Sequence, residues 1–190
     1  MSHPENYQEW VKTEGNLEHP THLETLLKPE QQARIKWLKE HCSGTDVLDI
    51  GCNWGYVLNE LNGLCGVDIN IENIDKAMKE FPTRSFLCAD VTKGLPFKND
   101  QYSTVIMADV LEHLNWDDVE NTLKEGLRIA YKKLLITLPQ LQTEDCACCF
   151  KHRWIPDKVS IGNIVVWLAQ MARKVSIEYD THFVFMEVLK

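Results

Sequence analysis

Several features are missing from this chain, and each absence narrows the class of protein. No uninterrupted apolar run reaches the length of a membrane span, and the opening residues, MSHPENYQEW, lack the regions of a secretory signal. No cluster of roughly five or more Lys or Arg occurs, and the formal net charge of -8 would repel a phosphate backbone. We therefore expect a cytoplasmic protein that binds neither membranes nor nucleic acid.

The seven cysteines do not follow the pattern of a disulfide framework or a zinc site. Their number is odd and no signal sequence precedes them, so we expect reduced thiols. Three of them cluster at Cys146, Cys148 and Cys149, without a second thiol pair at metal-site spacing. Idle or buried thiols are the simpler interpretation, and binding of a soft metal or metalloid is the alternative.

Short apolar runs that resemble buried strands alternate with helix-like stretches. These runs cover residues 47–50, 64–69, 85–90, 103–109 and 133–139. Strands separated by crossovers form a parallel sheet. A helix around 157–173 is followed by β-rich runs at 174–180 and 182–190, whose short connection allows only an antiparallel hairpin. The pattern predicts a doubly wound α/β fold, with a mostly parallel seven-stranded sheet, an antiparallel C-terminal hairpin and helices on both faces.

The chain length favours one domain over residues 1–190. Residues 1–42 are expected to form an N-terminal cap and helix, with the helix beginning at Pro29, and residues 45–190 the α/β core. Residues 1–28 are polar and broken by prolines, yet carry Tyr7 and Trp10, which suggests a lid that orders over a ligand.

The most informative stretch is VLDIGCNWGYVLNEL at 47–61, a buried strand that runs through a glycine turn into a helix. Gly51 and Gly55 would let a ligand approach the backbone, although a plain turn that uses glycine for its geometry is the alternative. Asp68 ends the second strand, where a carboxylate can bind ribose hydroxyls, and Asp90 ends the third, within reach of a purine amino group. These acids predict a nucleotide-like ligand at one edge of the sheet.

At this point the sequence resembles the class I S-adenosylmethionine-dependent methyltransferases, which have a Rossmann-like fold. Their first motif reads D/E-x-G-x-G-x-G, and here Asp49-Ile50-Gly51-Cys52-Asn53-Trp54-Gly55 matches it except that Asn53 replaces the middle glycine. Asn readily takes a positive φ, so the turn should be retained. The motifs of dinucleotide-binding oxidoreductases, G-x-G-x-x-G, and of phosphate-binding loops are absent.

The resemblance implies S-adenosyl-L-methionine as cofactor and assigns positions around it. Asp49 and Gly51 would lie near the methionine part, Asp68 at the ribose, Asp90 with Val91 at the adenine, and Asp109 on the sulfonium side. The complete implied cofactor site is Asp49, Gly51, Cys52, Asn53, Gly55, Asp68, Ile69, Asp90, Val91 and Asp109.

Methyl transfer needs positioning and, for some acceptors, a base, and His113 is the best candidate for that base. Some relatives hold a divalent metal through a Glu-His pair in this place, so Glu112, His113 and His152 could form a metal site. We expect no metal, because adjacent residues on a helix point away from each other.

The expected function is methylation of a small molecule on oxygen or nitrogen, with residues 140–160 completing the pocket. Methylation of a thiol or metalloid through Cys146, Cys148 and Cys149 is the leading alternative. A non-catalytic, S-adenosylmethionine-binding partner subunit is another. The oligomeric state has no signature in the sequence.

Overall fold

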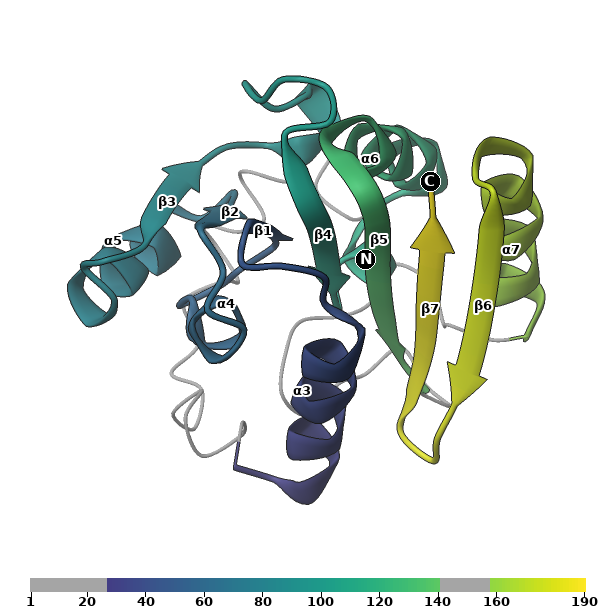
Figure 1. The fold of residues 1–190 in the computed structure, drawn as a ribbon, viewed down its shortest axis with the longest axis horizontal. Coiled ribbons are helices and arrows are strands. Elements are labelled where there is room, and N and C mark those ends of the chain that lie inside the picture. The colour runs from purple at the N-terminus through teal and green to yellow at the C-terminus, as the bar shows by residue number, and fades with distance from the viewer. Residues whose placement is uncertain (1–26, 141–157) are drawn as a thin grey trace, which may run out of the picture.

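The computed structural model describes residues 27–140 and 158–190, and these build a seven-stranded sheet in the order β3-β2-β1-β4-β5-β7-β6 (Figure 1). The strands are β1 (Val47–Ile50), β2 (Cys65–Asp68), β3 (Ser85–Cys88), β4 (Tyr102–Ala108), β5 (Ala130–Pro139), β6 (Lys174–Tyr179) and β7 (Phe183–Leu189). The pairings from β3 to β5 are all parallel, and β7 pairs antiparallel with both β5 and β6. The predicted doubly wound fold with an antiparallel hairpin is confirmed.

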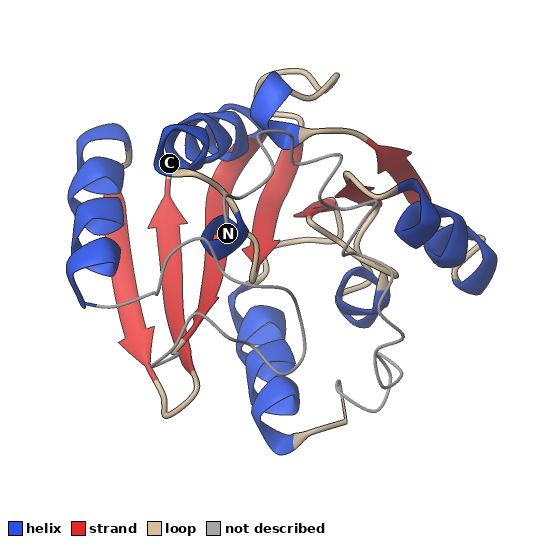
Figure 2. Cartoon of the chain, turned by 180° about the vertical axis from the view of Figure 1, so that it is seen from behind, coloured by secondary structure: helices blue, strands red, loops and turns tan. Residues whose placement is uncertain are grey.

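Helices cover both faces of the sheet (Figure 2). They are α3 (Pro29–His41), α4 (Tyr56–Glu60), α5 (Ile71–Glu80), α6 (Trp116–Ile129) and α7 (Lys158–Met171), with short 3-10 helices η1 (Val91–Lys93) and η2 (Leu111–His113). Pro29 occupies the first turn of α3, as predicted, because a proline there lacks only an N–H that the helix does not use.

The core has two layers because neighbouring residues of a strand point to opposite faces. On one face, Val105 and Met107 of β4 join apolar residues of α6 and α7 in one cluster. On the other face, Ile106 of β4 packs with Trp37 and Leu38 of α3 in a second cluster. This two-sided burial explains why the central strands read as continuous apolar runs in the sequence.

The element boundaries differ from the predicted ones by a few residues, and two differences have a clear cause. β3 ends at Cys88 rather than at residue 90, because Asp90 caps η1 and accepts the backbone N–H of Thr92 at 3.0 Å. β5 starts directly at the C-cap of α6, at Ala130, three residues before the predicted start. A helix that runs straight into a strand leaves no polar loop to mark the boundary.

The turn between β6 and β7 is closed by the side chain of Asp180. Its Oδ1 accepts the backbone N–H groups of His182 and Phe183, both at 2.6 Å. Gln140, directly after β5, donates its side-chain Nε2 to the carbonyl oxygens of Asp180 and Phe183 at 2.7 and 3.1 Å. The hairpin is thereby fastened to the carboxyl end of β5.

Some sequence-based expectations fall outside the described residues. These are the lid with Tyr7 and Trp10, the cysteines at 146, 148 and 149, His152, and most of the segment expected to complete the pocket. Among the residues that are described, no helix has the length and apolar character needed to cross a membrane.

Candidate active site

The loop that joins β1 to α4 holds three residues in the left-handed region of backbone conformation. Gly51, Asn53 and Gly55 have φ values of 79°, 50° and 80°. Asn53 therefore takes the positive φ that was predicted for it, and the turn survives the loss of the middle glycine. The loop is tied to β2, since the N–H groups of Gly51 and Cys52 both donate to the Val67 carbonyl, at 2.7 and 2.9 Å.

Both glycines of this loop are required by neighbouring protein side chains. A Cβ at Gly51 would lie 2.4 Å from Cγ2 of Val110, and one at Gly55 would lie 2.8 Å from the Phe86 ring. Of the two interpretations drawn from the sequence, these contacts support a turn that uses glycine for geometry and packing.

Asp68 ends β2, as predicted, and its carboxylate is fixed by the motif loop and the start of α5. Its Oδ2 accepts the backbone N–H of Asn53 at 2.8 Å, and its Oδ1 accepts the backbone N–H of Asn70 at 2.8 Å. Burial raises the pKa of this carboxyl group, although these hydrogen bonds act in the opposite direction. Asn53 is thus placed beside Asp68, and Ile69 follows at the strand end.

Asp49 is the most deeply buried acid among the predicted cofactor residues, with 2% of its surface exposed. Loss of hydration raises its pKa to about 7; the nearby Arg34 guanidinium opposes this shift, while Asp68 adds to it. Asp49 lies inside β1 next to Gly66 of β2 and Ile106 of β4. A carboxyl group that titrates near neutrality is a common feature of functional sites.

Arg34 brings a buried positive charge to this edge of the sheet, and the sequence analysis missed it. Its guanidinium forms an ion pair with Asp109, which directly follows β4, and lies 5.2 Å from the centre of the Phe183 ring. Thr137 Oγ1 donates to the other carboxylate oxygen of Asp109 at 3.1 Å. Arg34 lies one helical turn before Trp37 and Leu38, so it occupies the apolar face of α3. A charged residue on an apolar helix face is the signal by which the sequence could have indicated it.

The Arg34 pair also changes the interpretation of Asp109. The sequence placed Asp109 on the sulfonium side of the pocket, and the structure shows its carboxylate engaged by Arg34 and Thr137. Its φ of 57° is unusual for a residue other than glycine. Strained backbone of this kind clusters at functional sites, where the surrounding contacts maintain it.

Asp90 and Val91 belong to the turn that follows β3. The carboxylate of Asp90 accepts both the N–H and the hydroxyl of Thr92, at 3.0 and 2.7 Å, while Val91 packs against the main core cluster. Asp90 therefore has a structural task, the capping of η1, in addition to any contact with a ligand.

Glu112 and His113 lie in the 3-10 helix η2. Glu112 is fully buried and His113 is half-buried, so the two neighbouring side chains have different environments. Within residues 27–140 and 158–190, no group of three His, Cys, Asp or Glu side chains is placed to hold a metal ion.

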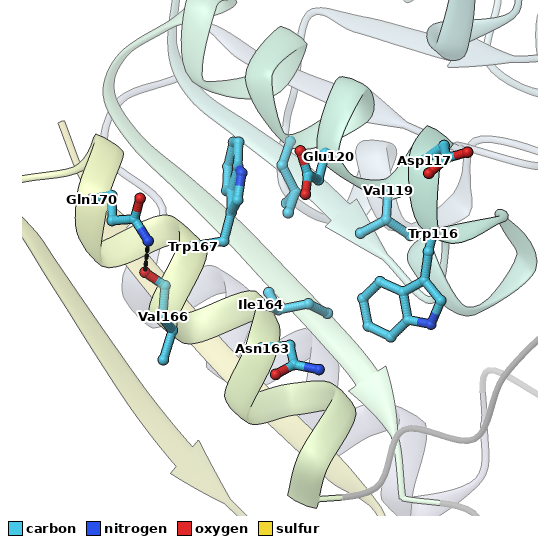
Figure 3. Close-up of a pocket in the computed structure, with 10 residues that line it drawn as sticks. Trp116, Asp117, Val119, Glu120, Asn163, Ile164, Val166, Trp167 and Gln170 are labelled. Carbon is cyan, nitrogen blue, oxygen red and sulfur yellow. Dashed lines mark hydrogen bonds between the residues drawn. The ribbon is translucent and has the colours of Figure 1, made fainter.

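A groove of about 440 Å³ lies between α6 and α7, away from these acids (Figure 3). Trp116 and Trp167 line it together with Asp117, Glu120 and Ile164, and the cofactor residues predicted from the sequence are not among its lining. Trp54 lies elsewhere and packs against α5.

Comparison with known proteins shows what this chain resembles. Residues 47–132 match the family model of the methyltransferase domain. This segment runs from β1 to the first residues of β5 and contains the motif loop, Asp68, Asp90, Asp109 and His113. No curated protein sequence matched the chain.

Solved structures with the same fold are numerous. A possible histamine N-methyltransferase from Thermotoga maritima has a TM-score of 0.71 at 15% identity, with 97% of this chain and 98% of that chain covered. The magnesium protoporphyrin IX methyltransferase of Synechocystis PCC 6803 was crystallised with bound S-adenosylhomocysteine. It has a TM-score of 0.66 at 16% identity, with 96% of this chain and 97% of that chain covered. A methyltransferase from Aquifex aeolicus has a TM-score of 0.63 at 18% identity, with 90% of this chain and 97% of that chain covered.

Identities this low establish the shared fold. Residues 47–132 are therefore similar to the methyltransferase domain, in a chain that has the fold of S-adenosylmethionine-dependent methyltransferases.

Proposed function

We propose that this enzyme transfers the methyl group of S-adenosylmethionine to an oxygen or nitrogen of a small molecule. The observation that carries the proposal is the group of buried charges at the carboxyl ends of β1, β2 and β4, where Asp49, Asp68 and the Arg34–Asp109 pair gather. In open α/β sheets, ligands bind at this edge. Two structural neighbours whose names specify an acceptor, a possible histamine N-methyltransferase and a magnesium protoporphyrin IX methyltransferase, support a small-molecule class.

The residues at this edge fit the cofactor chemically. Asp68 would accept the ribose hydroxyls, and Asp90 with Val91 would contact the adenine. Gly51, Cys52, Asn53, Gly55 and Ile69 would border the cofactor through the loop and the strand end. When bound, the cofactor supplies an activated methyl group on a sulfonium, which is a good leaving group.

Arg34 and the acids near it suit the amino acid end of the cofactor, which carries a carboxylate and an ammonium group. Nε of Arg34 is buried and has no hydrogen-bond partner among the described residues, so the guanidinium keeps a donor for an incoming carboxylate. Asp109 and Asp49 would face the ammonium group. This assignment gives the buried arginine a function that packing does not explain.

His113 is proposed as the base that accepts a proton from the acceptor molecule. It lies four residues after Asp109, in the turn that follows β4. An imidazole can accept a proton near neutral pH, and the neighbouring Glu112 is fully buried. The alternatives that rest on His152 or on Cys146, Cys148 and Cys149 involve residues outside the described part of the chain.

The direct test is a turnover assay with S-adenosylmethionine labelled in its methyl group, against pools of small amines, phenols and alcohols. We expect label to appear in one chemical class of acceptor, with release of S-adenosylhomocysteine. Binding of the cofactor without transfer to any pool would favour the non-catalytic partner subunit. Transfer only to thiols or arsenite would favour the cysteine-based alternative.

A further inference from the structure

A chain of side-chain hydrogen bonds links the motif loop, α5 and Asp68. The indole Nε1 of Trp54 donates to Asn73 Oδ1 at 3.0 Å, and Nδ2 of Asn73 donates to Asp68 Oδ1 at 3.4 Å. On its other oxygen, Asp68 accepts the backbone N–H of Asn53 at 2.8 Å, and Asn53 is bonded directly to Trp54 in the loop. The chain of contacts therefore closes into a ring.

The chemistry of these groups gives the ring one direction. An indole N–H can only donate and a carboxylate can only accept, whereas a carboxamide does both. Asn73 is thus suited to bridge Trp54 and Asp68, and it can do so in one orientation, with its oxygen toward Trp54. Trp54 and Asp68 therefore favour the same orientation of the Asn73 amide.

Helix α5 holds Asn73 and Trp54 in place. It is capped by Asn70, whose Oδ1 accepts the N–H of Glu72 at 2.9 Å. Asn73 and Lys76 are three residues apart and lie on one side of this helix. The ammonium group of Lys76 lies 4.3 Å from the centre of a Trp54 ring, so the indole contacts α5 through its edge and its face.

The hydrogen bonds leave Asp68 room for further donors. A carboxylate has about four lone-pair sites, and two are taken by the short backbone bonds from Asn53 and Asn70. The 3.4 Å contact with Asn73 is long, so Asn73 can orient Oδ1 and still share this oxygen with an arriving hydroxyl. The carboxylate is held by its short bonds and remains able to accept two hydroxyl groups.

We propose that Trp54 and Asn73 are positioning residues that orient Asp68 for the ribose hydroxyls of the cofactor. The inference rests on the proposed function, in which Asp68 binds the ribose. It assigns a specific task to Trp54, a residue that the motif of the family leaves unspecified. Neither Trp54 nor Asn73 need touch the cofactor for this effect.

The experiment compares two ligands, S-adenosylhomocysteine and its 2′,3′-dideoxy analogue, by calorimetry. The ratio of their dissociation constants measures the contribution of the ribose hydroxyls. In Trp54→Phe, we expect this ratio to fall about three- to ten-fold, which is the effect of losing one hydrogen bond. Binding of the dideoxy analogue should stay near the wild-type value.

Asn73→Leu, which removes the bridging amide at similar volume, should lower the ratio by a similar factor. Lys76→Met is the matched control, because it removes the charge over the ring and keeps the indole N–H; the ratio should remain that of wild type. Thermal melting of each variant checks folding, and Asn73→Leu decides the question if Trp54→Phe does not fold.

Asp68→Asn separates the inference from the proposed function. If Asp68→Asn abolishes the preference for the ribose form while Trp54→Phe and Asn73→Leu retain the wild-type ratio, the positioning role is overturned and the ribose site stands. Equal weakening of both ligands in Trp54→Phe also overturns it, since that pattern indicates general damage to the loop. If Asp68→Asn keeps the preference, Asp68 does not bind the ribose, and the inference falls with that assignment.

Discussion

At the residue scale, Asp49 links stability to pH. Its folded pKa of about 7 lies above the value of 3.8 for an unperturbed carboxyl, so between about pH 4 and pH 7 the folded chain binds more protons than the unfolded chain. Stability is therefore lost as the pH rises through this window. Asp49→Asn removes the buried charge, and the variant should melt above wild type at pH 8, with a gap that shrinks toward pH 4.5.

The same substitution should weaken binding of S-adenosylmethionine at pH 8, because the ionised carboxylate favours the cationic cofactor. Melting curves and calorimetry at the two pH values measure both effects. A variant that melts below wild type at pH 8 would show that the attraction between Asp49 and Arg34 exceeds the cost of burial.

Arg34 permits a second residue-scale test, because a natural ligand without the amino acid end exists. 5′-Methylthioadenosine carries the adenosine and sulfur of the cofactor and lacks the carboxylate and ammonium groups. Arg34→Met should weaken the binding of S-adenosylhomocysteine by ten-fold or more, since a charge-assisted hydrogen bond contributes about 1.5–3 kcal/mol. Affinity for 5′-methylthioadenosine should change little; an equal loss for both ligands would assign Arg34 to packing alone.

The acids of the site and Arg34 show what the sequence could and could not predict. Asp68 and Asp49 could be found from the motif, because each stands at a fixed place relative to a buried strand and a glycine turn. Arg34 could not be paired with Asp109, since 75 residues separate them in the chain and only the folded sheet brings α3 over the end of β4. Likewise, the Trp54–Asn73 bond depends on how the loop packs against α5.

At the element scale, the motif loop depends on the absence of a side chain at Gly51. Gly51→Ala would place a Cβ 2.4 Å from Val110 and force a left-handed alanine at φ 79°, which costs roughly 1–2 kcal/mol before the clash is counted. We expect a lower free energy of unfolding in urea and weaker cofactor binding.

Gly162→Ala in α7 is the matched control for this element. An added Cβ there meets no atom of the described residues within 4 Å, and alanine favours a helix over glycine by about 1 kcal/mol. This variant should be at least as stable as wild type. Equal stability of both variants would remove the geometric requirement at Gly51.

The turn after β4 carries the catalytic prediction. His113→Ala should slow turnover by about 10²–10⁴-fold, the usual contribution of a general base, and leave the affinity for S-adenosylhomocysteine nearly unchanged. The measurement is made with and without a chelator. Activity that the chelator abolishes and a divalent ion restores would instead support the Glu112, His113 and His152 metal site, and a fully active variant would remove His113 from the mechanism.

At the scale of the whole molecule, cofactor binding at the junction of several strands should stabilise the entire fold. S-adenosylhomocysteine at about 100 times its dissociation constant contributes about 2.7 kcal/mol. For a chain of this size, that corresponds to a rise of roughly 5–10 °C in melting temperature. Thermal denaturation at several ligand concentrations measures this rise. A melting temperature that does not change with ligand concentration would contradict binding to the folded state.

The sheet order also constrains the sequence of events by which the chain folds. β6 precedes β7 in the chain, yet β7 lies between β6 and β5, so β6 has no place on the sheet until β7 is there. β6 therefore joins the sheet together with β7 or after it, through the hairpin closed by the Asp180 turn. In pulsed hydrogen exchange during refolding, amides of β6 should become protected together with those of β7 and never before them.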